Sequence, residues 1–138
     1  MNKRIRIYYM KNILSIALLL FIASSGCKKD TQSTGPAGNW ELRIQDGGIV
    51  GIHKEFAEGN GTTIQFNADN TFTMYNQFKL VNQGTFQYRK NAITLGTSTY
   101  DGLYYNGASN GEVVQLSGNT LVIGLNYDDG FTVTYVRL

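Results

Sequence analysis

The amino-acid sequence predicts an all-β protein, a small up-and-down antiparallel β-barrel of about eight to ten strands preceded by a signal peptide. The chain has 138 residues, the size of one ordinary domain, with 16 glycines and a single proline. Aromatic residues make up 12% of it, a mixture typical of short strands joined by glycine turns. After Gly38, apolar and polar residues alternate, and the three- and four-residue apolar spacing of a helix is absent. A sandwich is the alternative, but consecutive hairpins favour a closed barrel, because closure leaves no unpaired edge strand.

The first 26 residues have the three-part order of a secretory signal peptide. Residues 1–12 are positively charged, residues 13–23 are apolar except for Ser15, and small residues precede Cys27. The apolar run is too short to span a bilayer comfortably, although a membrane-anchor helix or a buried helix is the alternative. We therefore predict a lipoprotein signal peptide over residues 1–26.

The formal net charge of +2 belongs to this leading segment. Four of the 12 Lys and Arg residues lie in the first 11 positions, whereas the first acidic residue is Asp30. The rest of the chain has 8 basic against 10 acidic residues, a net charge of about −2. This balance predicts no nucleic-acid partner, because nucleic-acid binding requires Lys and Arg clustered on one face.

Cys27, in the stretch SSGCKKD, is the only cysteine, so a disulfide within the chain is excluded. A catalytic thiol would need a nearby base, and the only histidine is His53, in an expected strand. The residues SSGC resemble the lipobox of bacterial lipoproteins, although Ser24 stands where Leu is usual. In that motif the cysteine receives a diacylglyceryl group and becomes the first residue after cleavage. The resemblance implies that Cys27 is lipidated and attaches the protein to the Gram-negative cell envelope, at the periplasmic face or the surface of the outer membrane.

Residues 27–37 are polar and small, which predicts a flexible tether between the lipidated cysteine and the domain. Lys28, Lys29 and Asp30 distantly resemble the short charged signal that sends some lipoproteins of the Bacteroidota to the cell surface. The folded domain is predicted over residues 38–138.

Residues 62–78, TTIQFNADNTFTMYNQF, predict two strands joined by a turn at Asp69 and Asn70. The apolar positions of each strand share one face. They are Ile64 and Phe66 in the first strand, and Phe72, Met74 and Phe78 in the second.

The remaining chain repeats this pattern. Residues 84–95 predict a hairpin turning at residues 89–91, and residues 113–125 predict another turning at residues 117–119. Asp129 and Gly130 then predict a turn into the last strand, residues 131–138. The expected facing pairs are Phe86 and Tyr88 against Ile93 and Leu95, and Val114 and Leu116 against Leu121, Ile123 and Leu125, with Phe131, Val133 and Tyr135 on one face of the last strand.

GNW at residues 38–40 is similar to the Gly-x-Trp that begins lipocalins, and the order of the later strands resembles the lipocalin-like domains of Bacteroidota lipoproteins. The resemblance covers residues 38–138. It implies that Trp40 plugs one end of the barrel and that Arg137 packs over it as a cation–π pair. The chain has no Thr-Asp-Tyr motif and no helix after the last strand, and the domain is short. These departures predict a small cavity, or one open at one end, in place of a deep calyx.

No pattern of a catalytic or metal site is present. His53 is the single histidine, which excludes a histidine-based metal cluster, and no Gly-x-Ser-x-Gly elbow occurs. The acidic pairs, Glu55 with Glu58 and Asp128 with Asp129, lie at expected strand ends or turns, where acidic residues are common. We predict no enzymatic activity, no metal and no cofactor.

Residues 96–111, GTSTYDGLYYNGASNG, interleave three tyrosines with Gly, Asn and Ser. They predict either an irregular strand with a long loop at a barrel rim or a rim surface that binds a small apolar or sugar-like ligand. The candidate ligand-binding residues are Tyr100, Tyr104, Tyr105 and Tyr127.

Two functions remain open from the sequence. The first is a lipid-anchored binding protein that holds a small hydrophobic or amphipathic ligand in or at the barrel mouth. The second is a protein-interaction module, an accessory subunit or an inhibitor, displayed at the cell envelope. We expect a monomer that meets the membrane through its lipid anchor.

Overall fold

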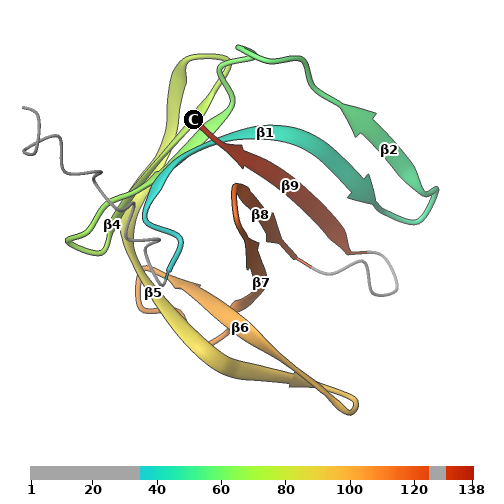
Figure 1. Ribbon diagram of the computed structural model, residues 1–138, viewed down its shortest axis with the longest axis vertical. Helices are drawn as coiled ribbons and strands as arrows, with labels where there is room; N and C mark the ends of the chain where they lie inside the picture. Colours follow the sequence, from blue (N-terminus) through green and yellow to red (C-terminus); the bar gives the residue numbers. More distant parts are fainter. Residues whose placement is uncertain (1–34, 125–129) are drawn as a thin grey trace, which may run out of the picture. The chain divides into compact units, whose positions relative to one another are not determined.

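The computed structural model describes residues 35–124 and 130–138, which form nine β-strands (Figure 1). Eight strands close into an antiparallel barrel, and β2 is an additional short strand, so the predicted fold class is confirmed. The predicted signal peptide and Cys27 lie outside the described residues. The strands are β1 (Gly38–Gly47), β2 (Ile52–Glu55), β3 (Thr63–Phe66), β4 (Thr71–Asn76), β5 (Lys79–Leu95), β6 (Ser98–Tyr105), β7 (Glu112–Ser117), β8 (Thr120–Ile123) and β9 (Phe131–Arg137).

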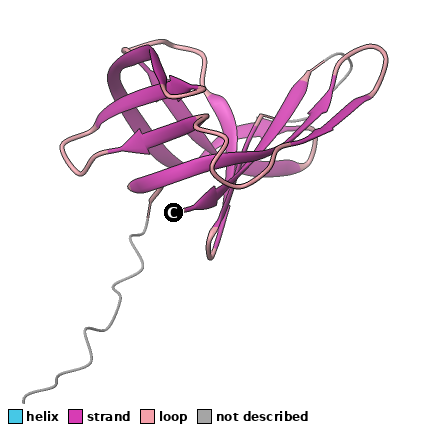
Figure 2. Cartoon of the chain, turned by 90° about the horizontal axis from the view of Figure 1, so that it is seen from above, coloured by secondary structure: helices cyan, strands magenta, loops and turns pink. Residues whose placement is uncertain are grey.

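All the regular secondary structure of the described residues is β-strand (Figure 2). The described part of the chain contains no helix that is long and apolar enough to cross a membrane.

Pairing between β1 and β9 closes the barrel, from Trp40 opposite Arg137 to Gly47 opposite Phe131. The other edge of β1 is shared: residues 38–41 pair with β3, and the last part of β1 pairs with β2. Two short strands, β2 and β3, therefore pair with different parts of the same edge of β1, and a connection without strand structure joins them.

This connection, residues 56–62, is held by the carboxylate of Glu41, whose side chain is only 3% exposed. Glu41 Oε2 accepts a hydrogen bond from Gly59 N at 3.1 Å, and Oε1 accepts one from Gly61 N at 3.4 Å. Arg43 Nη1 lies 2.8 Å from Oε2, as an ion pair at an angle unfavourable for a hydrogen bond. The buried carboxylate thus satisfies backbone N–H groups that the interrupted strand leaves without ladder partners.

Inward-facing apolar side chains fill most of the barrel interior. The largest fully buried ones are Trp40, Ile64, Phe66, Phe72, Leu103, Val114 and Leu121. The predicted cross-strand neighbours are confirmed for Ile64 with Met74, Phe66 with Phe72, Val114 with Ile123, and Leu116 with Leu121. The alternation of the sequence therefore identifies the core face of these strands correctly.

Two predicted turns are also confirmed by their backbone conformation. Asn70, with a φ of 64°, ends the turn between β3 and β4, and Gly118, with a φ of 56°, lies in the turn between β7 and β8. Asn and Gly enter the left-handed region more readily than other residues, so both sequences suit their turns.

The predicted hairpin at residues 89–91 is wrong. β5 continues through this stretch to Leu95 and pairs with β6, and the register shifts between Arg89 and Ile93. Asn91 has a φ of 51°, and its N–H donates to Asp101 Oδ1 at 2.9 Å. A β-bulge and a turn both favour a polar residue that adopts a left-handed backbone conformation, so the local sequence does not distinguish the two.

Phe78 was expected on the core face of the second strand and is instead 76% exposed. β4 ends at Asn76, and Phe78 lies in the tight connection to β5 with a φ of 65°. The alternation therefore stops two residues before the aromatic side chain.

Because neighbouring strands are antiparallel, the connections gather at two ends of the barrel. The loop end, as we name it, carries residues 48–51, 77–78 and 106–111, together with Gly124 and Gly130. The Trp40 end carries the turns at residues 67–70, 96–97 and 118–119, together with residues 35–37.

Candidate ligand-binding site

A cleft of about 380 Å³ lies at the loop end, beside β7, β8 and β9. Most of its lining is apolar, and the lining includes one carboxyl group. The lining residues are Glu112, Val113, Ile123, Gly124, Phe131 and Val133. A mainly apolar concavity with few polar groups is the usual form of a small-molecule site.

The local backbone explains why the cleft lies here. Ile123 opposite Val133 is the final pair of β8 and β9, and the two strands leave the ladder beyond it. Gly124 then turns with a φ of 88°, and its N–H donates to Val113 O at 2.8 Å. A Cβ at this position would lie 2.3 Å from Phe131 O, so the close approach of the two strand ends requires glycine.

Tyr105 places a polar atom in the barrel interior, outside the lining of the cleft. Its ring lies edge-to-face against Phe72, with ring centroids 4.9 Å apart, and parallel to Phe66 at 6.5 Å. The hydroxyl is shielded from solvent and has no hydrogen-bond partner among the described residues. A buried hydroxyl without a partner is uncommon, because it loses its hydrogen bonds to water without replacement.

Glu112 and Tyr135 are the charged and polar neighbours of Tyr105. Register places all three on the inner face, because Glu112 lies opposite Leu103 and Tyr135 lies opposite Leu42. Burial, followed by the Glu112 carboxylate, raises the pKa of Tyr135 to about 12. Burial, followed by the Glu112 carboxylate, also raises the pKa of Tyr105.

Glu112 lies between the barrel interior and the solvent. The residue as a whole is solvent-exposed, but many protein atoms surround its carboxyl, and this desolvation raises its pKa above the ordinary value. It forms no ion pair or hydrogen bond with any residue that the structure describes. The site therefore contains a carboxyl group whose charged form has no counter-charge among the described residues.

The opposite end is filled by Trp40, which has no exposed surface. Its Nε1 donates to Pro36 O at 2.6 Å, and the guanidinium of Arg137 lies 4.1 Å from the centre of its ring. Arg137 Nη1 also donates to Ala37 O at 2.8 Å. The resemblance implied this contact of Trp40 with Arg137, and the last residues of the expected tether, 35–37, take part in it.

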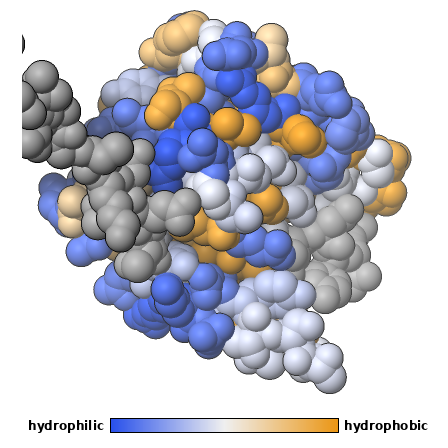
Figure 3. All heavy atoms as spheres, viewed as in Figure 1, coloured by the Kyte–Doolittle hydropathy of each residue, from blue (hydrophilic) through white to orange (hydrophobic). Residues whose placement is uncertain are grey.

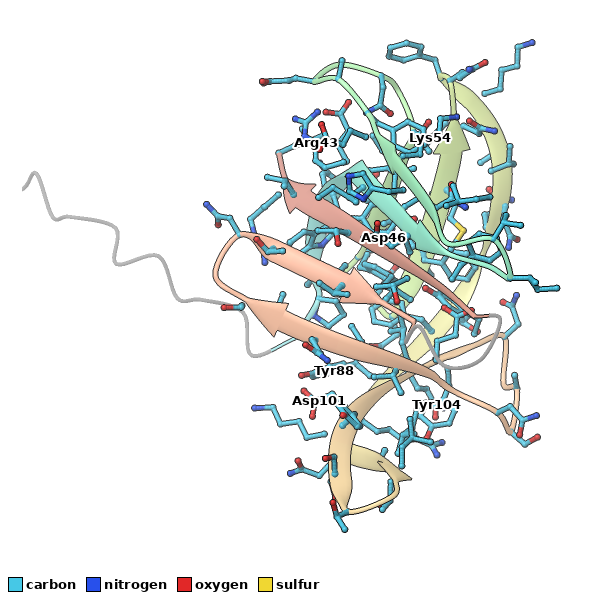
Figure 4. All side chains as sticks on the ribbon, turned by 90° about the vertical axis from the view of Figure 1, so that its right-hand side faces the viewer. Arg43, Asp46, Lys54, Tyr88, Asp101 and Tyr104 are labelled. Carbon is cyan, nitrogen blue, oxygen red and sulfur yellow. The ribbon has the colours of Figure 1, made fainter. Side chains whose placement is uncertain are left out.

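Near the turn between β5 and β6, Tyr88 and Asp101 face each other inside the barrel (Figure 4). Tyr88 donates its hydroxyl to Asp101 Oδ2, which lowers the pKa of Asp101. Burial, together with this hydrogen bond, raises the pKa of Tyr88 to about 12. Both polar groups are satisfied within the protein, so this pair supports the bulge of β5 and offers no open bonding capacity.

The structure separates the four tyrosines proposed as ligand-binding residues. Tyr104 lies on the outer face, 8% exposed, with Arg89 stacked 4.4 Å from its ring centre. Tyr105, the next residue, points inward, while Tyr100 lies opposite Ile93 near the other end of β6. The fourth, Tyr127, lies outside the described residues.

Sequence reasoning missed Glu112 and Tyr135 as site residues. A signal for Glu112 was present, because it shares the two-residue alternation of Val114 and Leu116 and therefore faces the interior. Tyr135 shares the alternation of the last strand, but its position relative to β7 depends on the pairing of β7 with β8 and of β8 with β9.

His53 lies on the outer face of β2, away from the cleft. Its Nδ1 is 2.5 Å from Asp46 Oδ1, and its Nε2 is 3.3 Å from Glu55 Oε1. Hydrogen bonding to Asp46, then to Glu55, raises its pKa above 6.5. Within residues 35–124 and 130–138, no three His, Cys, Asp or Glu side chains are arranged to hold a metal ion.

Comparison with known proteins gives one match. Residues 37–123 match the family model described as a lipocalin-like domain. No curated protein and no solved structure matches the chain. The matched residues include β1 to β8 and therefore most of the barrel.

Proposed function

Because the chain belongs to the lipocalin-like domain family, we propose that it is a non-catalytic binding protein that holds a small hydrophobic or amphipathic molecule at the loop end of its barrel. Membership of this family supports a barrel that binds ligands. The lining residues of the cleft indicate where in the barrel a ligand could bind.

The cleft of about 380 Å³ beside β7, β8 and β9 carries the proposal. Its volume falls in the range of small-molecule sites, and Ile123, Val133 and Phe131 supply apolar walls. Below the cleft the interior is occupied by buried aromatic and aliphatic side chains. The ligand therefore sits at the mouth of the barrel.

Native mass spectrometry of the full-length protein, followed by solvent extraction of any bound molecule, tests this function. Val133→Phe narrows the cleft from inside, whereas Thr134→Phe adds the same ring to the outer face of the same strand. We expect a bound small molecule in the wild type and in Thr134→Phe, and its loss in Val133→Phe. Ligand occupancy that Val133→Phe does not change would contradict the assignment to this cleft.

We further propose that Cys27 is lipidated and anchors the protein to the outer membrane of a Gram-negative cell envelope. The support is the order of a charged segment, an apolar run and small residues immediately before the only cysteine. Cys27→Ala should abolish incorporation of labelled fatty acid. Ser25→Ala, which keeps a small residue before the cysteine, should not. Continued labelling of Cys27→Ala would refute the anchor.

A second candidate function is that of a protein-interaction module at the envelope. Large apolar side chains are exposed at two connections of the loop end: Ile49 and Val50, each 83% exposed, and Phe78. Figure 3 shows apolar atoms at the tip of the β1–β2 hairpin, at the right of the view. The tyrosines of residues 96–111 no longer support this candidate, because Tyr104 is buried.

Cross-linking in the intact envelope distinguishes this candidate. A partner specific to the hairpin tip should be lost when Ile49 and Val50 are both replaced by Ser, and retained when Val133→Phe closes the cleft. A partner recovered equally from both variants would not use the tip.

A further inference from the structure

The polar groups at the loop end restrict which ligand the cleft can hold. Its walls are apolar, and the acidic group among them is Glu112. A ligand at this site therefore meets apolar walls and one carboxyl group.

Glu112 determines the sign of the ligand charge. No basic residue is among the described residues that line the cleft, and Arg137 is held at the Trp40 end by Trp40 and Ala37 O. An anionic head group would therefore meet a carboxylate with no cation in the described lining to offset it. A cationic head group would supply the missing counter-charge in a partly desolvated setting, where charge-assisted hydrogen bonds are strongest.

We propose that the cleft binds an amphipathic amine, with its ammonium group donating a hydrogen bond to the Glu112 carboxylate and its hydrocarbon part against Ile123, Phe131 and Val133. This inference rests on the proposed ligand-binding function and specifies its ligand class.

Three probes of equal chain length test the proposal: dodecylamine, dodecanol and dodecanoate, each kept below its micellar concentration. Each competes with a neutral fluorescent naphthyl probe for the full-length protein. We expect dodecylamine to bind about tenfold more tightly than dodecanol, the value of one charge-assisted hydrogen bond, and dodecanoate to bind most weakly.

Two variants test the contribution of the carboxyl group. Glu112→Gln should remove the preference for the amine while dodecanol affinity is retained, which also shows that the cleft is folded. Glu58→Gln removes the same charge from the exposed connection between β2 and β3 and should change nothing.

The outcomes divide cleanly between the two proposals. If dodecanoate binds most tightly, or the amine preference survives in Glu112→Gln, the amine inference is overturned while ligand binding stands. If none of the three probes displaces the fluorophore from the wild type, ligand binding at the cleft itself is overturned.

Discussion

The contact between Trp40 and Arg137 should be one of the strongest side-chain couplings in the described barrel. Trp40 has no exposed surface, and the guanidinium of Arg137 lies 4.1 Å from its ring centre. A desolvated cation–π contact contributes about 2 kcal/mol. The hydrogen bond from Arg137 Nη1 to Ala37 O, at 2.8 Å, adds about 1.5 kcal/mol or more, because its donor is charged.

Arg137→Met keeps an apolar chain over the ring and removes both interactions. We expect it to lower the free energy of unfolding by about 2–3 kcal/mol, since the methionine restores part of the lost contact. In a double-mutant cycle with Trp40→Phe, the coupling energy should be about 1–2 kcal/mol.

Urea denaturation followed by far-UV circular dichroism measures all four proteins of the cycle. The pair formed by Arg89 and Tyr104 is the matched control: its cation lies 4.4 Å from the ring on the outer face, and Arg89 is exposed. Its coupling should be about 0.5–1 kcal/mol. A Trp40–Arg137 coupling below about 0.3 kcal/mol, the scatter of independent sites, would refute the reasoning.

Three further predictions concern the rest of the barrel. Glu41→Gln should lower the free energy of unfolding by about 3 kcal/mol in urea denaturation, because Arg43 loses its buried counter-charge. Proton NMR should show a pKa of His53 above 6.5, and Asp46→Asn should lower it, since the Asp46 hydrogen bond is the main cause of the rise. This interaction stabilises the fold fully below pH 6.5 and is lost as the pH rises through the folded-state pKa. Gly47→Ala should lower the melting temperature and cost more than about 2 kcal/mol, because φ is 121° and its Cβ would lie 2.1 Å from a backbone carbonyl oxygen.

Each of these predictions has a matched control. Glu58→Gln should leave stability nearly unchanged, and a loss equal to that of Glu41→Gln would contradict the role of the buried carboxylate. Glu55→Gln should lower the histidine pKa less than the aspartate variant does, because its hydrogen bond is the weaker cause. Gly118→Ala, with a φ of 56° but no atom within 4 Å of its Cβ, should cost only about 1 kcal/mol. Equal losses for the two glycine variants would exclude the steric explanation.

Much of the barrel is predictable because strand periodicity is local. The alternation around Asn70 and around Gly118 identifies two hairpins with their correct inward residues. The prediction of a hairpin at residues 89–91 failed because the same local sequence is compatible with two structures. Asn91 and its polar neighbours suit a turn and a bulge equally, and pairing along the whole of β6 decides for the bulge.

The candidate site was likewise predictable only in part from the sequence. Alternation places Tyr104 and Tyr105 on opposite faces as soon as the strand is placed, so a rim built from both was not compatible with a regular strand. The environment of each tyrosine depends on distant segments. Tyr104 is covered by Arg89 from the neighbouring strand, while Tyr105 lies against Phe66 and Phe72.

By itself, the sequence determined the all-β class and the one-sided alternation of most strands, because each of these is a property of consecutive residues. The signal peptide over residues 1–26 stays a prediction. Only the tertiary structure decided that Glu112 lines one cleft together with Ile123, Phe131 and Val133. These residues come from β7, β8 and β9, and their proximity depends on the register between these neighbouring strands. Register and closure are set by the sum of many long-range contacts, which no short stretch of the chain encodes.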